Sequence, residues 1–145
     1  MDERLLELAL IEEEYLRINI FTHPLAPFRK ELEELGVIKS KDLASLKGGS
    51  NVKVAGRVVL VHTPPTKSGI RIMFITIEDE YGLIDLTLLP EAQKRYSRTL
   101  LLNSLCYFEG TLRKYGKRSI SITIERIIPL GEILSGIIET KKDLG

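Results

Sequence analysis

The order of strands, turns and one helix between residues 52 and 130 constrains the fold more than any other feature of the chain. Apolar runs of strand length alternate there with residues that favour turns, among them Tyr81-Gly82 and Tyr115-Gly116-Lys117. Pro90 is typical of the first turn of a helix. The expected elements are strands over 52–62, 71–78 and 83–89, a helix over 91–101, and strands over 105–114 and 118–127.

This succession, with Gly56 inside a long first strand, is the order of the OB-fold, a small five-stranded barrel. We therefore predict an all-β OB-fold barrel over residues 51–130, with a helix between strands three and four. A small α-helical segment over residues 1–50 is expected to precede it, because apolar residues recur there at helical spacing.

Within the first 50 residues, Pro27 to Leu35 is expected to form a helix that Gly36 ends. Ser40 is expected to cap a short turn, and Gly48-Gly49-Ser50 to act as a linker. Residues 131–145 form a tail whose apolar stripe fits a short helix; the stripe comprises Ile133, Leu134, Ile137 and Ile138. Packing on the barrel is expected of it, with docking of a partner or a second copy as the alternative.

Composition narrows the class of protein. The hydrophobic fraction of 43% can fill one core, and no apolar run approaches the roughly 18 residues needed to span a bilayer, so no membrane association is expected. Asp2 and Glu3 stand where a signal peptide would carry basic residues. The single cysteine, Cys106, excludes an internal disulfide and, with only two histidines, argues against a structural zinc site. A cytoplasmic protein without a cofactor is expected.

Alternation along the strands assigns a face to each side chain, because successive residues of a strand point to opposite sides. The inward set comprises Met73, Ile75, Ile77, Ile84, Leu86, Leu88, Cys106, Phe108, Gly110, Leu112, Ile120, Ile122 and Ile124. The outward set on strands two and three comprises Ile72, Phe74, Thr76, Leu83, Asp85 and Thr87. In OB-folds this outward face, between the loop after strand one and the loop between strands four and five, holds oligonucleotides.

Phe74 is the best candidate for stacking on a base, unless the strand is one residue out of phase and Phe74 belongs to the core. Residues 51–130 hold 12 Lys/Arg and 7 Asp/Glu, so the barrel carries a net +5 that favours a polyanion. The candidate binding residues are Arg57, His62, Lys67, Arg71, Phe74, Thr76, Asp85, Thr87, Arg113, Tyr115 and Lys117.

Five motifs resemble the C-terminal region of the bacterial DNA polymerase III alpha subunit, most closely its error-prone paralogue. They are Thr22-His23-Pro24-Leu25, Val54-Ala55-Gly56-Arg57-Val58, Pro64-Pro65-Thr66-Lys67-Ser68-Gly69, the run from Phe74 to Gly82, and Phe108-Glu109-Gly110-Thr111-Leu112. The likeness covers about residues 5–130. It implies an OB domain that handles single strands near a polymerase, whose catalytic domains lie upstream and are absent from this sequence.

The acidic run Glu78-Asp79-Glu80 raises the alternative of metal or acid–base chemistry. Alternation sends Glu78 and Asp79 to opposite faces, so we expect these residues to serve the turn and solubility instead. His23 is expected to cap or pack the helical segment, and no catalytic residue or metal site is predicted.

The expected function is that of a non-catalytic module that binds single-stranded nucleic acid and is linked to DNA replication or repair. Its partners would be single-stranded DNA, with RNA as the alternative, and a DNA polymerase or replisome protein. Two other functions stay open: a protein-interaction adaptor of a polymerase assembly, and an RNA-binding domain of the anticodon type.

Overall fold

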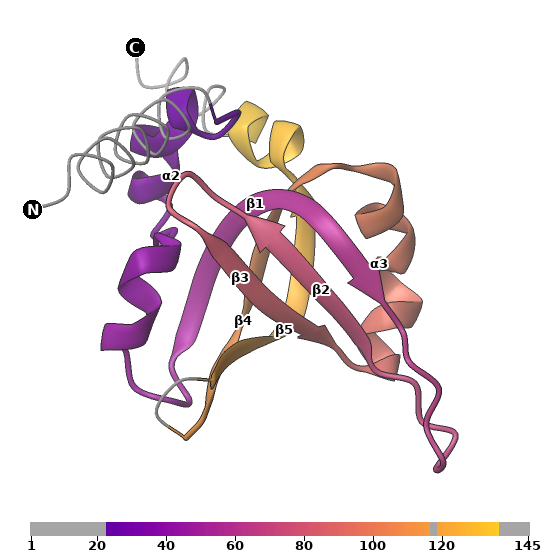
Figure 1. The fold of residues 1–145 in the computed structure, drawn as a ribbon. Helices are drawn as coiled ribbons and strands as arrows, with labels where there is room; N and C mark the ends of the chain where they lie inside the picture. The colour runs from indigo at the N-terminus through magenta and orange to yellow at the C-terminus, as the bar shows by residue number, and fades with distance from the viewer. Residues whose placement is uncertain (1–22, 117–118, 137–145) are drawn as a thin grey trace, which may run out of the picture.

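The computed structural model describes residues 23–116 and 119–136, and within them five strands close into a barrel (Figure 1). The strands are β1 (Asn51–His62), β2 (Met73–Glu78), β3 (Leu83–Leu88), β4 (Leu105–Tyr115) and β5 (Ser119–Pro129). Helix α3 (Pro90–Leu102) connects β3 to β4. The spatial order is β1-β2-β3-β5-β4, and only β3 and β5 pair in parallel. The predicted OB-fold is confirmed.

The long strand β1 closes the barrel because its two halves pair with different neighbours. Its first half pairs with β4 and its second half pairs with β2, and Arg57 takes part in both pairings. Gly56 lies at this bend, where an added Cβ would come within 2.9 Å of the carbonyl oxygen of Glu78. The close approach of β2 explains why glycine stands inside a strand here.

Gly110 has the same role on β4, at an irregularity in its pairing with β5 between Glu109 and Gly110. A Cβ at Gly110 would lie 2.2 Å from the carbonyl oxygen of Thr123, which no side chain can tolerate. The bulge therefore requires glycine, and it bends β4 at this position.

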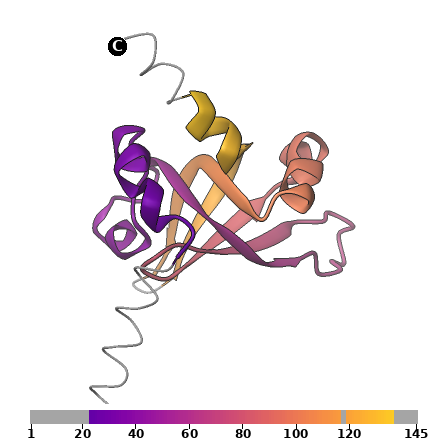
Figure 2. The same ribbon diagram turned by 90° about the horizontal axis from the view of Figure 1, so that it is seen from above.

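The barrel interior holds the residues that alternation assigned to it. Ile75 and Ile77 of β2 and Leu86 of β3 are at most 1% exposed, whereas Phe74 is 45% exposed, so the predicted phase of β2 is confirmed. Met73 and Ile120 are only partly buried and pack against the core from its rim. Leu100 of α3 joins the same core, and α3 lies along one flank of the barrel (Figure 2).

A second apolar cluster lies outside the barrel, between β1, β4 and the segments at either end of the described chain. Its buried members are Leu25, Leu32, Val37, Ala55, Tyr107, Ile128, Leu130 and Leu134. Residues 130–136 are helical, and Leu134 is buried in this cluster, as expected for a tail that packs on the barrel. Ile137 and Ile138 lie outside the described residues.

The segment before the barrel differs from the sequence-based prediction at Ser40. Residues 26–34 are helical, as a 3-10 turn η1 (Ala26–Phe28) followed by α2 (Arg29–Glu34), and Gly36 follows with a φ of 87°. Ser40 begins a second 3-10 helix, η2 (Ser40–Ser45), but its side chain caps nothing and binds Asp79 instead. Residues 1–22, the first part of the expected helical segment, lie outside the described residues.

Gly48-Gly49-Ser50, expected to act as a linker, lies between η2 and β1 and is hydrogen-bonded to β4. Gly49 donates its N–H to the carbonyl oxygen of Leu112 at 2.7 Å, and Leu112 donates to that of Ser50 at 2.8 Å. Gly49 and Ser50 therefore extend the backbone contact between β1 and β4. No helix within residues 23–116 and 119–136 is long and apolar enough to cross a membrane.

Candidate nucleic-acid interface

A groove of about 780 Å³ crosses the outer face of β2 and β3 and continues onto the adjoining ends of β4 and β5. We call it the β2–β3 groove. Its lining residues are Ile72, Phe74, Ile75, Thr76, Asp85, Leu86, Thr87, Leu89, Arg113, Tyr115, Ser119, Ile120, Ser121 and Thr123. The alternation that buries one side of each strand in the barrel exposes the other side here.

Two aromatic side chains line the groove and remain open to solvent. Phe74 comes from β2, and Tyr115, 66% exposed, comes from the last position of β4. An exposed aromatic in a concave surface offers a flat face to a nucleotide base, because stacking requires only the face of the ring. Both residues were candidates from the sequence.

Hydroxyl groups form the polar part of the floor. Thr76 donates a hydrogen bond to Asp85 Oδ1 at 3.2 Å, between directly paired positions of β2 and β3. The hydroxyls of Thr87 and Ser121 lie 3.0 Å apart and join β3 to β5. These hydroxyl and carboxylate groups can donate or accept hydrogen bonds to bases or sugars. The hydrogen bonds among them fix the positions of the side chains that line the groove.

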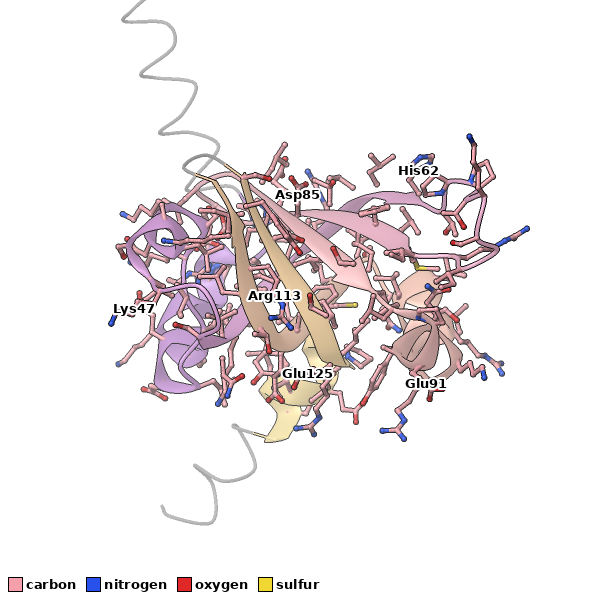
Figure 3. The ribbon with its side chains drawn as sticks, turned by 90° about the horizontal axis from the view of Figure 1, so that it is seen from below. Lys47, His62, Asp85, Glu91, Arg113 and Glu125 are labelled. Carbon is pink, nitrogen blue, oxygen red and sulfur yellow. The ribbon has the colours of Figure 1, made fainter. Side chains whose placement is uncertain are left out.

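The charge of the groove is close to balanced. Among its described lining residues, Arg113 is the only cation and Asp85 is the only anion. Figure 3 shows Arg113 over the β4–β5 pair, between Asp85 and Glu125. One guanidinium fits one phosphate contact, so the affinity expected from charge inside the groove is modest.

The structure brings together six of the eleven candidates in this groove: Phe74, Thr76, Asp85, Thr87, Arg113 and Tyr115. His62 is exposed at the end of β1, where it pairs with Phe74 across the strands. Lys67 and Arg71 are exposed on the loop between β1 and β2, which projects from the barrel in Figure 1. The carbonyl oxygen of Arg71 accepts a hydrogen bond from Gln93 of α3 at 2.7 Å.

Like His62, Lys67 and Arg71, Arg57 does not line the groove, and it is held elsewhere by an ion pair. Its Nη2 donates to Glu78 Oε1 at 2.8 Å, near the opposite end of β2. The guanidinium already has an anionic partner there, and it does not line the groove. Lys117 lies outside the described residues.

Sequence reasoning missed the contribution of β5. Ser119, Ser121 and Thr123 line the groove, and Thr123 lies directly opposite Thr87 in the parallel pairing. The signal was present, because the inward isoleucines at 120, 122 and 124 alternate with these small polar residues. What the sequence does not show is that β5 lies beside β3.

The acidic turn after β2 has a structural role, and the expectation that it serves solubility is wrong. Asp79 is 1% exposed, and its carboxylate accepts hydrogen bonds from the N–H groups of Tyr81 and Gly82, which confirms its role in the turn. It also accepts from the N–H of Ser40 at 2.7 Å and from the Ser40 hydroxyl at 2.6 Å. Asp79 therefore fastens η2 to the β2–β3 turn.

Glu80 fastens α2 to the same turn. It is 3% exposed and forms a two-pronged ion pair with Arg29, whose Nε donates at 2.6 Å and whose Nη2 donates to the second oxygen. Burial opposes ionisation of Glu80, but the hydrogen bonds and charge of Arg29 outweigh it, so the pKa of Glu80 lies below its usual value.

His23 packs in the helical segment, as expected. It is 4% exposed, its Nδ1 accepts a hydrogen bond from the N–H of Leu25, and its Nε2 lies 3.5 Å from Glu78 Oε1. In the described part of the chain, no group of three or more His, Cys, Asp or Glu side chains is placed to hold a metal ion.

A closed barrel of this strand order, with a helix between β3 and β4 and a groove on its β2–β3 face, defines an OB-fold domain. The chain belongs to the OB-fold nucleic acid binding domain family, whose model matches residues 52–130. A solved structure with the same fold is asparaginyl-tRNA synthetase from Pyrococcus horikoshii. It superposes with a TM-score of 0.50 at 14% identity over 65% of this chain and 22% of that one.

The sequence is also similar to segments of error-prone DNA polymerases. It is 32% identical to that of Bdellovibrio bacteriovorus over 114 residues, which cover 79% of this chain and 10% of the relative. The polymerase of Symbiobacterium thermophilum is 33% identical over 121 residues, 81% of this chain and 11% of the relative. These matches confirm the resemblance carried by the motifs, and the chain spans about a tenth of the length of these curated relatives.

Proposed function

We propose that this protein is a non-catalytic module that binds single-stranded DNA in the β2–β3 groove and serves DNA replication or repair. The observation that carries the proposal is the contrast between neighbours on β2, where Ile75 is 1% exposed and Phe74 is 45% exposed in a concave surface. A folded barrel has no need to expose a phenylalanine, so an exposed one beside polar hydroxyls fits a ligand with flat faces.

Single strands suit such a groove better than duplexes do. The faces of the bases are free in a single strand, whereas in a duplex they are stacked on their neighbours. Phe74 and Tyr115 can therefore stack only on unpaired bases. Stacking also reads a face common to all bases, so little sequence preference is expected.

The relatives support a link with DNA synthesis, since those reported above are named as error-prone DNA polymerases. A polymerase or another replisome protein is accordingly the partner that we propose, in the cytoplasm. The absence of catalysis is also part of the proposal. The carboxylates that the sequence offers at the β2–β3 turn are committed to Ser40 and Arg29, which leaves them unable to hold a catalytic ion.

The proposal is tested by titrating the protein into fluorescently labelled oligo-dT, oligo-rU and a DNA duplex at several salt concentrations. We expect weak binding to oligo-dT over about 4–16 nucleotides, with an affinity that falls as salt rises. Affinity that does not change with salt, or a preference for the duplex, would contradict it. Tighter binding of oligo-rU would favour the RNA-binding alternative of the anticodon type.

A protein-interaction adaptor is the second candidate, and one surface favours it. Val59, Leu60, Leu101 and Leu102 are all exposed. The N–H of Val58 donates to the carbonyl oxygen of Ser104 at 2.8 Å, which brings the end of α3 beside β1. Large exposed apolar patches are typical of protein contacts, and these four side chains are candidates for one. An adaptor that acts only through this surface predicts no binding to any of the three oligonucleotides.

A further inference from the structure

A second hollow, of about 710 Å³, adjoins the β2–β3 groove, and we call it the η2 recess. The two share four lining residues: Asp85, Tyr115, Ser119 and Ile120. Beyond them the recess is lined by Leu83 and Ile84 of β3 on one side and by Ser40, Leu43 and Ala44 of η2 on the other. Its far wall is therefore built by residues that precede the matched OB segment, residues 52–130.

This wall is fixed to the barrel. Leu43 is 4% exposed and belongs to the barrel core, and Ser40 is held by two hydrogen bonds to the buried carboxylate of Asp79. Just upstream, the N–H of Ile38 donates to the carbonyl oxygen of Lys53 at 2.8 Å. A ligand that enters the recess meets a surface that is already ordered, so binding there costs little conformational entropy.

The chemistry of the recess resembles that of the groove. Its apolar surface comes from Leu83, which is 64% exposed, and from Leu43 and Ala44, while Tyr115 stands between the two hollows. Lys114 holds an ammonium group against a residue that lines the recess, and Lys41 holds another beside the β2–β3 turn. Lys114 Nζ donates to the carbonyl oxygen of Ala44 at 2.8 Å, and Lys41, next to Ser40, holds its Nζ 4.4 Å from the ring centroid of Tyr81. The recess therefore offers an apolar wall to a base and, at Lys114, an ammonium group to a phosphate.

We propose that the η2 recess takes the nucleotides of the bound strand that lie beyond Tyr115, so that residues 40–44 form a second wall of the nucleic-acid site. This proposal rests on the function proposed above, since it extends the same bound strand. Continuity with the groove through four shared residues is what assigns the recess to the strand rather than to another ligand. Residues before the barrel then take part in binding, although residues 1–50 carry a net charge of −3.

The test compares two glutamate substitutions on η2. Ala44→Glu places a carboxylate in the recess, whereas Ser45→Glu adds the same charge at the next exposed residue, which does not line the recess. Leu83→Glu repeats the test from the opposite wall, because Leu83 lines the recess but not the groove. All three residues are exposed, so the variants are expected to fold, and their melting temperatures check this.

Affinity is measured for oligo-dT of about four and about eight nucleotides, lengths within the range of one OB-fold. We expect Ala44→Glu and Leu83→Glu to weaken binding of the longer strand by about tenfold or more and binding of the shorter strand by less than about twofold. Ser45→Glu is expected to change both by less than about twofold, since exposed charges are screened by salt. In the unmodified protein, the amide NMR signals of Ser40 and Ala44 should shift further with the longer strand.

The recess proposal fails by itself if the unmodified protein binds the longer strand but Ala44→Glu and Leu83→Glu bind it as tightly as Ser45→Glu does. It also fails if the amide signals of residues 40–44 do not respond to the longer strand. Absence of binding by the unmodified protein to either length would instead refute the proposed function and, with it, the recess.

Discussion

Phe74 lies directly opposite Thr87 in the antiparallel pairing of β2 and β3, and both side chains line the groove. Thr87 in turn meets the hydroxyl of Ser121 across the parallel pairing at 3.0 Å. An exposed ring on β2 thus lies beside two hydroxyls that join β3 to β5. The arrangement pairs a stacking surface with hydrogen-bonding groups at fixed separation, and it makes Phe74 the residue whose removal is most informative.

Phe74→Ala is expected to weaken oligo-dT binding by about 1–3 kcal/mol, roughly ten- to hundredfold, because one base loses its stacking partner. The melting temperature should hardly change, since the ring is 45% exposed and fills no part of the core. Fluorescence anisotropy and thermal unfolding measure the two effects separately.

Ile75→Ala is the matched control on the same strand. Ile75 is 1% exposed in the barrel core, so its truncation should lower the free energy of unfolding by about 2–5 kcal/mol. Under conditions where this variant remains folded, its affinity should fall far less than that of Phe74→Ala, because Ile75 is 1% exposed and offers almost no surface to a base. A large stability loss for Phe74→Ala, with none for Ile75→Ala, would refute the assignment of the groove face.

Arg113→Gln is expected to reduce the salt dependence of binding. If the guanidinium contacts one phosphate, the slope of log K against log salt should become shallower by about 0.7, the value for one contact on a single strand. Lys30→Gln, on the exposed surface of α2 and outside both hollows, removes the same charge as a control. Equal slopes for both variants would mean that Arg113 contacts no phosphate.

Asp79→Ala is expected to lower the free energy of unfolding by at least about 1–3 kcal/mol, because donors from Ser40, Tyr81 and Gly82 lose a buried acceptor. Asp42→Ala, on the exposed side of η2, should stay within about 0.5 kcal/mol. Urea unfolding measures both. An Asp79 variant as stable as the Asp42 variant would remove the argument for a fixed η2.

The Arg29–Glu80 pair predicts a stability that depends on pH. Glu80 has a lowered pKa in the folded protein, so its contribution is complete above the unfolded pKa of about 4.3 and is lost as the pH falls through the folded pKa. Glu80→Gln should therefore be less stable than the unmodified protein at pH 7, and the gap should narrow as acid protonates Glu80. A gap that is constant from pH 7 to about pH 3 would contradict the lowered pKa.

Substitution of two glycines by alanine tests whether the space around Gly110, rather than the presence of a glycine as such, determines stability. Gly110→Ala should lower the free energy of unfolding by more than about 3 kcal/mol, because its Cβ would lie 2.2 Å from the backbone oxygen of Thr123. Gly131→Ala, in the helical residues 130–136 with no atom within 4 Å of its Cβ, should be neutral or stabilise by up to about 1 kcal/mol. Chemical denaturation of both variants would show whether the bulge in β4 needs glycine.

Much of the barrel follows from local rules. A strand with one buried face must alternate, so the inward and outward residues of β2 and β3 follow from the pattern once the phase is set by Ile75 and Ile77. The groove candidates on β2, β3 and the end of β4 come from the same alternation. Glycine inside β1 likewise indicates a bend before any partner strand is known.

What the sequence did not reveal depends on which segments meet in space. Asp79 looks like an exposed turn residue until Ser40, 39 positions earlier, is seen to donate to it. Arg57 looks like a free cation until Glu78 is found on the neighbouring strand. The η2 recess forms only where β3, the end of β4 and η2 come together. The residue pattern within each of these segments does not predict that the other two lie beside it.

The contacts of Asp79 and Glu80 also bear on how the barrel can be cut or moved. A fragment that starts at residue 52, where the family match begins, would lack Ser40, Arg29 and Leu43. It would leave Glu80 without its ion-pair partner and Asp79 without the two donors of Ser40, and it would open one side of the core to water. We therefore expect the smallest piece that folds well to begin upstream of Arg29. To transfer the groove to another protein, the N-terminal residues that contact Asp79 and Glu80 would therefore have to be transferred as well.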